Sequence, residues 1–239
     1  MTLRLPEGVS PRASAPVALV RRADFHSHSY LTDGETSPTD MWNEAEALEH
    51  RALALTDHLS MEDPKPLLDR LHQEAKAWEG RSFQPIVGVE LTKIPPPRIA
   101  SVARACRNAG AEIVIVHGET IVEFVPEGTN HAAIESGLVD VLAHPGLLDP
   151  KDAELARAQS VVLEISGREG HSLANGHVVR VALEAGADLV VDSDAHAPEQ
   201  LIPLERAGRI ALGAGVPESQ LERVLFATPT ELIRRTNGS

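Results

Sequence analysis

Seven short apolar runs recur along the 239-residue chain, and each ends in a polar cluster. Their length and their Val, Ile and Leu content are typical of strands buried on both faces. The runs occupy residues 18–28, 51–58, 83–91, 111–119, 139–146, 160–166 and 187–196. Their final polar residues are 20 to 32 positions apart, as a strand, a helix and two short loops require. The pattern predicts a parallel sheet covered by helices, either a closed barrel or an open doubly wound sheet.

Helical signals lie between these runs. Residues 37–52 begin with Ser37 and Pro38, which suit the cap and the first position of a helix. Residues 97–110 and 172–187 are also predicted helices, and Gly110 and Gly186 are their expected stops.

Composition and charge narrow the class of protein. Residues 1–20 lack periodicity and contain three prolines, so we predict an N-terminal extension rather than a secretory signal, followed by one domain over 21–239.

The net charge of −13 argues against binding of long nucleic acids, because nonspecific binding to a phosphate backbone depends on Lys and Arg side chains. Cys106 is the one cysteine, which suits a reducing compartment. No apolar stretch approaches the ~20 residues of a membrane span, so a soluble cytoplasmic protein is expected, with its oligomeric state open.

The polar clusters at the ends of the runs contain the candidate functional residues. Side chains two apart on a strand project to the same side, so His26 and His28 can hold one ion together, as can Asp194 and His196. The carboxyl ends of parallel strands meet on one face, where active sites lie. The same positions of the other runs supply four more candidates: His58, Glu90, His117 and His144.

Imidazoles mixed with carboxylates favour zinc, iron or manganese over calcium. A lone histidine at a strand end is usually structural, but here six of the eleven histidines end five different strands. The other five are expected to be structural: His50, His72, His131, His171 and His177. With Asp33, which follows the first run, the candidates number nine, enough for three ions with open positions or for two ions with spare ligands. Clustered metals suit displacement at phosphorus.

The motifs together resemble the polymerase and histidinol phosphatase (PHP) family. They are His26-x-His28, Thr32-Asp33-Gly34, Thr56-Asp57-His58, Gly88-Val89-Glu90, His117-Gly118, Ala143-His144-Pro145-Gly146 and Ser193-Asp194-Ala195-His196, in family order between about 24 and 198. The resemblance implies a distorted TIM-like (β/α)7 barrel with a trinuclear centre of zinc, manganese or iron. It assigns His26, His28, Glu90 and Asp194 to the first ion. Glu90 would bridge to a second ion on His117 and His144, and Asp33, His58 and His196 would hold the third.

The resemblance identifies substrate-binding residues less directly than it identifies metal ligands. Histidinol phosphatases hold the substrate phosphate with arginines, and Arg168 is the best-placed candidate here, although an exposed loop role fits it equally. Lys93 and His171 are further candidates. We expect Asp57 and Glu119 to orient ligand histidines. Asp194, His196 or a metal-bound water would protonate the leaving group.

The resemblance and the ligand set predict a metal-dependent phosphoesterase. The sequence contains no GxSxG elbow and no GxxxxGK[ST] loop. We therefore expect attack at phosphorus by a metal-bound hydroxide, on a small phosphorylated metabolite, as in histidinol-phosphatase-like monoesterases. One alternative is a phosphodiesterase, nucleotidase or promiscuous ester hydrolase at the same site. Another is a non-catalytic metal-binding regulatory domain.

Overall fold

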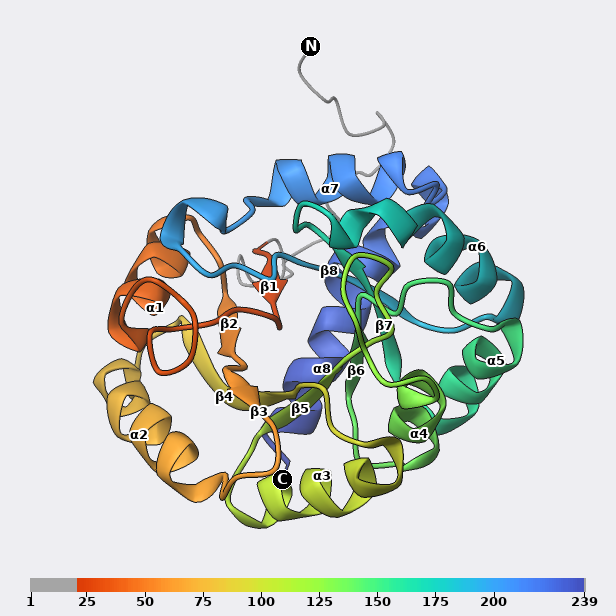
Figure 1. Ribbon diagram of the computed structural model, residues 1–239. Helices are drawn as coiled ribbons and strands as arrows, with labels where there is room; N and C mark the ends of the chain where they lie inside the picture. Colours follow the sequence, from red (N-terminus) through yellow and green to blue (C-terminus); the bar gives the residue numbers. More distant parts are fainter. Residues whose placement is uncertain (1–20, 239) are drawn as a thin grey trace.

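The computed structural model describes residues 21–238, so the predicted N-terminal extension over 1–20 lies outside the described residues. Seven parallel strands form the central sheet in the order β1-β2-β4-β5-β6-β7-β8, and the short strand β3 pairs with β4. Their bounds are β1 Ala23–Asp24, β2 Ala52–Leu55, β3 His58–Leu59, β4 Gln84–Leu91, β5 Ile113–His117, β6 Val141–Ala143, β7 Val162–Ser166 and β8 Leu189–Asp192. Figure 1 shows these strands as a ring surrounded by helices. Of the two predicted architectures, the nearly closed barrel is the observed one.

The barrel closes between β1 and β8 through few backbone contacts. A parallel bridge joins Ser27 to Ala195, and the amide of His28 donates to the carbonyl of Ala195 at 2.8 Å. Buried carboxylates complete the seam. Asp192 accepts from the amide of Phe25 at 2.8 Å, and Asp24 accepts from the amide of Ser193 at 3.1 Å. These hydrogen bonds to carboxylates replace backbone hydrogen bonds that the two-residue strand β1 is too short to form with β8.

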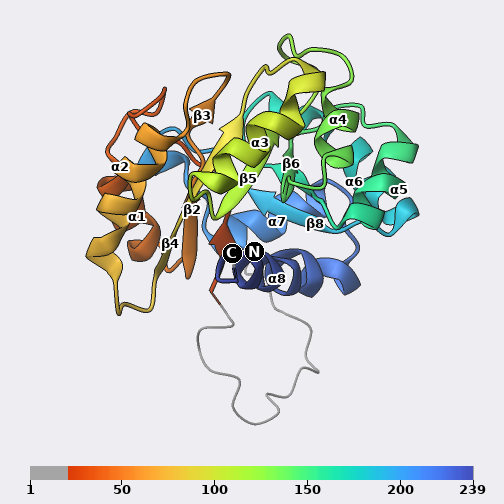
Figure 2. The same ribbon diagram turned by 90° about the horizontal axis from the view of Figure 1, so that it is seen from below.

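The α-helices cover the outside of the barrel in Figure 1, apart from the last one, which is seen through the middle of the ring. They are α1 Pro38–Ala47, α2 Lys65–Ala75, α3 Ile99–Asn108, α4 Thr129–Glu135, α5 Pro150–Gln159, α6 Asn175–Ala185, α7 Leu204–Gly213 and α8 Thr228–Thr236. Shorter helical turns are η2 Lys76–Trp78, η3 Pro96–Arg98, η4 His171–Ala174, η5 Pro198–Gln200, η6 Glu218–Gln220 and the π-helical η7 Arg223–Ala227. Figure 2 shows α8 beneath the strands. Leu232 of α8 packs into the inner core and so closes the end of the barrel where the strands begin.

Side chains alternate between the inside of the barrel and the helix layer. Along β4, Ile86 packs in the inner core and Val87 in the outer core. The two-residue period therefore puts Glu90 on the same face as Ile86, further along the strand. In β5, His117 follows Ile115 in the same way. Apolar side chains fill the barrel interior near the amino ends of the strands, and polar side chains line it at their carboxyl ends.

The predicted helices at 37–52, 97–110 and 172–187 are observed as α1, α3 and α6, but α1 ends at Ala47 and Ala52 already belongs to β2. Gly110 and Gly186 follow α3 and α6 with φ of 100° and 71°, a backbone conformation that favours glycine. Cys106 is buried in α3, and burial raises the pKa of its thiol to about 12, as suits a packing residue. No helix between residues 21 and 238 is long and apolar enough to cross a membrane.

Removing the cap of α1 is expected to destabilise the fold modestly. The hydroxyl of Ser37 accepts a hydrogen bond from the amide of Asp40 at 3.1 Å. Ser37→Ala leaves that amide without its cap and should lower the free energy of unfolding by about 1 kcal/mol. Urea unfolding followed by circular dichroism measures the change. Ser219→Ala, at an exposed position, is the control, and equal stabilities of the two variants would contradict the capping role.

Candidate metal centre

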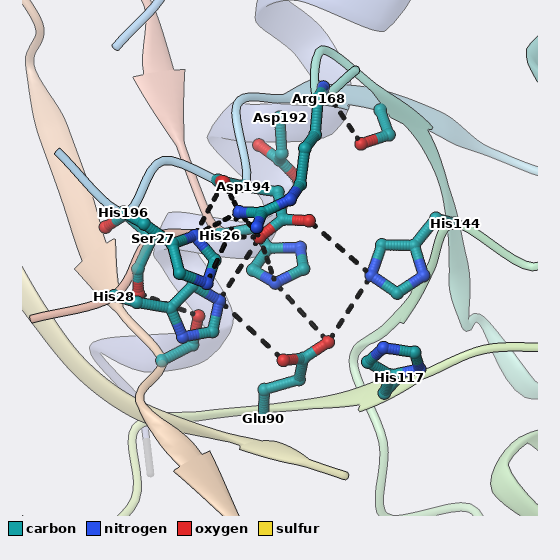
Figure 3. Close-up of polar contacts among 12 residues, drawn as sticks. His26, Ser27, His28, Glu90, His117, His144, Arg168, Asp192, Asp194 and His196 are labelled. Atoms are coloured by element: carbon teal, nitrogen blue, oxygen red, sulfur yellow. Dashed lines mark hydrogen bonds and ion pairs between the residues drawn. The ribbon is translucent and has the colours of Figure 1, made fainter. Parts of the chain in front are cut away.

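The carboxyl ends of the strands bring the nine predicted ligands together (Figure 3 labels seven of them). Potential ligand atoms gather into overlapping clusters in which all atoms lie within 4.8 Å of one another. These clusters are His26/His28/Asp194, His26/Glu90/His144, His117/His144/His171 and His28/Asp33/His58/His196. They overlap with the three predicted ion sets, which we call the first, second and third ligand groups: His26/His28/Glu90/Asp194, Glu90/His117/His144 and Asp33/His58/His196. All nine residues belong to these groups, and His171 is an addition to them.

The first group lies deepest in the barrel. The Nε2 atom of His28 is 3.3 Å from Oδ1 of Asp194, and Nε2 of His26 is 3.6 Å from the same oxygen. Glu90 lies opposite, with Oε1 at 3.4 Å from Nε2 of His26. All four residues are at most 3% exposed. Two imidazoles and two carboxylates therefore face a common point inside the barrel.

The second group shares Glu90 with the first. Its Oε1 atom is 3.5 Å from Nε2 of His144, whose ring lies 4.5 Å, edge to face, from the ring of His117. Gly118 permits this approach, because a Cβ there would lie 2.4 Å from the carbonyl oxygen of Ala143. The φ angles of His144 and Asp194 are 27° and 52°, in a region that residues other than glycine rarely adopt. Strain of this kind is typical of functional sites.

The third group lies nearest to solvent. Oδ2 of Asp33 is 3.3 Å from Nε2 of His58 and 3.3 Å from Nε2 of His196. The ring of His28 stacks on that of His58 at 4.3 Å, which links this group to the deepest one. Asp33 is half exposed, so this corner is open to entering molecules.

The donor set fits bound divalent cations. Among residues 21–238, Nε2 of His26, both ring nitrogens of His28 and Oε1 of Glu90 are buried without a hydrogen-bond partner. Unpaired buried polar atoms are costly, so a convergent set of them implies a ligand. Burial, followed by the nearby rings of His58 and His26, lowers the pKa of His28 to about 4. Burial would raise the pKa of Asp194, but His26 and His28 lower it, so a neutral ring lies beside an ionised carboxylate.

Orienting contacts differ from those predicted. Glu164 of β7, which was not among the predicted residues, accepts from Nδ1 of His26 at 2.6 Å. Asp57 instead accepts from the hydroxyls of Ser29 and Thr32 at 2.8 and 2.7 Å, and so shapes the loop that carries Asp33.

Glu119 likewise organises a loop. It accepts from the amide of Asn130 at 2.9 Å and anchors the β5 loop to α4. The expected bonds from Asp57 and Glu119 to ligand histidines are therefore replaced by contacts that position loops.

Arg168, Lys93 and His171 all line a cavity of about 300 Å³ above the ligand groups. Nη1 of Arg168 donates to the carbonyl of Asp194 at 3.0 Å and contacts the ring of His196. Lys93 pairs with Glu123 at 2.7 Å across the mouth. Glu123 also contacts His117 at 3.1 Å and was not among the predicted residues.

His171 is the one histidine of the five expected structural ones that enters the site. Burial, then the neighbouring His144 ring, lowers its pKa to about 3. The other four histidines form hydrogen bonds outside the site. The pairs are His50 with Arg22, His72 with Gly110, His131 with Asp152 and His177 with Leu148.

Metal affinity is expected to rise with pH. Burial would lower the pKa of His58, but Glu90 and Asp33 raise it to about 9 in the metal-free protein. The pKa of His26 is also raised, by Asp194, Glu164 and Glu90 against the effect of burial. Both rings hold protons below these pKa values, and a cation must displace them.

Zinc competition with a chromophoric chelator at pH 6, 7, 8 and 9 measures this effect. After correction for the chelator, the logarithm of the affinity should increase by about one per pH unit for each displaced proton. A constant affinity over this range would contradict the proton competition.

The chain is similar to known proteins in sequence and in fold. The family model described as the PHP domain matches residues 24–184. An uncharacterized protein of Methanocaldococcus jannaschii is 43% identical over 218 residues, which cover 90% of this chain and 99% of that protein.

Two solved structures share the fold. A chain in the structure of archaeal Ribonuclease P with mature tRNA has a TM-score of 0.67 and 16% identity, covering 91% of this chain and 92% of that chain. Histidinol phosphate phosphatase of Lactococcus lactis, complexed with zinc, L-histidinol and phosphate, has a TM-score of 0.57 and 14% identity, covering 82% and 95%. At these identities the likeness concerns the fold alone.

Proposed function

The chain belongs to the PHP domain family, and from that premise we propose that it is a metal-dependent phosphoesterase acting on a small phosphorylated metabolite, with histidinol-phosphatase-like monoesters as the first candidates. One observation carries the proposal. Nine ligand-competent side chains converge beneath a single cavity that Arg168 also lines. A module that had lost catalysis would be expected to lack some of these ligands.

The protein groups have separable roles in such a reaction. Divalent ions held by these residues would supply Lewis acidity that activates water and neutralises developing charge. Arg168 borders the same cavity and would hold phosphoryl oxygens through charge-assisted hydrogen bonds. Asp194 and His196 lie beside its guanidinium. Because Asp194 is ionised, it would have to take up the proton of the attacking water before it passes one to the leaving oxygen, and His196 is the other candidate for that transfer. Glu164 holds the ring of His26 in one orientation.

The shape and charge of the protein favour a small substrate. The cavity of about 300 Å³ lies at the low end of small-molecule sites. The net charge of −13 opposes binding of a long phosphate backbone. A small phosphodiester or a nucleotide also fits these limits and is the alternative substrate class.

A subunit of a larger assembly is the second candidate function. Phe124, Leu147 and Leu173, on loops that follow β5, β6 and β7, are 79%, 68% and 71% exposed. A partner that covers these three loops would bury apolar surface that is otherwise in water. The likeness to a chain of archaeal Ribonuclease P gives this candidate a precedent in fold.

Phosphoester hydrolysis by metal-stripped protein, reloaded separately with manganese, zinc and iron, tests the proposal. The substrates are histidinol phosphate, an aryl phosphomonoester, an aryl phosphodiester and mononucleotides, with His117→Ala as the negative control. Metal-dependent turnover that the control lacks would support the enzyme, and the ratio of monoester to diester rates would identify the substrate class. Stoichiometric metal binding without turnover on any substrate would favour the assembly subunit.

A further inference from the structure

The loop after β7 brings one more histidine into the metal centre. His171 begins the short helix η4 and is 8% exposed. Its ring stacks on the ring of His144, with centroids 4.1 Å apart and an interplanar angle of 17°. It also meets the ring of His117 edge to face at 5.9 Å. His171 therefore lies against both histidines of the second ligand group.

One ring nitrogen of His171 is held and the other faces the ligands. Nδ1 is 2.8 Å from the hydroxyl of Thr120, a buried residue of the loop after β5. Nε2 lies 3.8 Å from Oδ2 of Asp194 and 3.8 Å from Oε1 of Glu123. This arrangement, with one nitrogen bonded to a fixed partner and the other directed at a cluster of donors, is typical of metal-ligating histidines.

The distances suit a shared ion. Ring nitrogens of His117, His144 and His171 all lie within 4.8 Å of one another. Zinc–nitrogen bonds are about 2.1 Å long, so two nitrogens on one tetrahedral ion are about 3.4 Å apart. Shifts of less than about an ångström in each ring would therefore bring the three rings onto one cation. A Cβ at Gly170 would lie 3.6 Å from the side chain of Val122, so the β5 and β7 loops run side by side next to His171.

We propose that His171 is a ligand of the second metal ion, together with His117, His144 and Glu90, and that Thr120 fixes its ring for this role. Four protein ligands fill a tetrahedral zinc site, which is the arrangement of tightly held rather than open ions. The second ion is then the most firmly bound of the centre, and the open positions belong to the other groups. This inference rests on the proposed metal centre, but it is tested by metal binding alone and not by turnover.

The test compares wild type with His171→Ala, His171→Gln and Thr120→Val. Zinc retained after dialysis against a chelator is counted by elemental analysis, and the visible absorption of the Co²⁺-loaded proteins reports coordination number. We expect His171→Ala and His171→Gln to lose one ion per chain, with its affinity reduced about 100-fold, and to lose the intense four-coordinate Co²⁺ band. Thr120→Val should reduce the same affinity about 10-fold, because it removes only the orienting bond.

His177→Ala is the matched control, because its ring bonds to the carbonyl of Leu148 outside the site. Thermal unfolding verifies that each variant folds, and His171→Gln provides the measurement if the alanine variant does not. Unchanged zinc content and an unchanged Co²⁺ spectrum in the His171 variants would overturn the inference, and a loss of phosphoester turnover alone would make His171 a substrate contact. Wild type that binds no metal would overturn both this inference and the metal centre, whereas metal binding without turnover would contradict only the proposed reaction.

Discussion

Replacing Glu90 with glutamine is expected to reduce phosphoester hydrolysis by at least about 1000-fold. The carboxylate of Glu90 touches imidazoles of two ligand groups, at 3.4 Å from His26 and 3.5 Å from His144. It also reaches His58 of the third group at 2.7 Å. A neutral amide keeps the size of the side chain but cannot offer two anionic oxygens to neighbouring cations. Initial rates on an aryl phosphomonoester, with metal content measured on the same samples, provide the test.

Glu112→Gln is the matched control for this substitution. Glu112 is another carboxylate of the barrel, half-buried where Glu90 is fully buried, and it accepts from the amide of Val87 at 2.8 Å at the opposite end of the strands. Its amide variant should keep both the bound metal and the rate. Equal activity of Glu90→Gln and wild type at full metal content would contradict the bridging role of Glu90.

Strand periodicity explains why so much of the site could be predicted. A charged residue is rarely found in a strand buried on both faces unless an ion or a side chain of opposite charge pairs with it. Glu90 and His117 stand out for this reason, because each continues the inward face of an apolar strand. Parallel strands bring such ends to one edge whatever the details of packing. The convergence therefore follows from local sequence, and the barrel rather than an open sheet follows from the closure between Ser27 and Ala195.

Contacts between loops explain what could not be predicted. His171 was predicted as a structural histidine and as a candidate substrate contact, but its place against His117 and His144 depends on the β5 loop that supplies Thr120. Glu123 lies on that loop, where no periodicity indicates direction. Glu164 did carry a signal, since it is a carboxylate inside an apolar strand, but its partner His26 is 138 positions away. Such pairings depend on tertiary structure, which a single sequence does not display.

Replacing Arg168 with alanine is expected to lower kcat/KM for a phosphomonoester by about 100-fold while leaving the metal content unchanged. Arg168 and Lys93 are the permanent cations among the described residues that line the cavity, and Lys93 is paired with Glu123 at 2.7 Å. In a protein with a net charge of −13, an incoming phosphate therefore depends on Arg168 and the metal ions for attraction. Steady-state kinetics at fixed metal loading measure the change.

Two further variants separate phosphate binding from a structural role of the loop. Arg168→Lys keeps the charge but loses the planar fork, so a loss of about 10-fold is expected, between wild type and alanine. Arg104→Ala removes the same charge from an exposed position on α3 and should leave kcat/KM unchanged. Nη1 of Arg168 also bonds to the carbonyl of Asp194 at 3.0 Å, so a loop-anchoring role predicts a loss of metal in Arg168→Ala. Intact metal with reduced kcat/KM therefore indicates phosphate binding, and a parallel loss of metal and rate indicates that Arg168 acts by holding Asp194 in place.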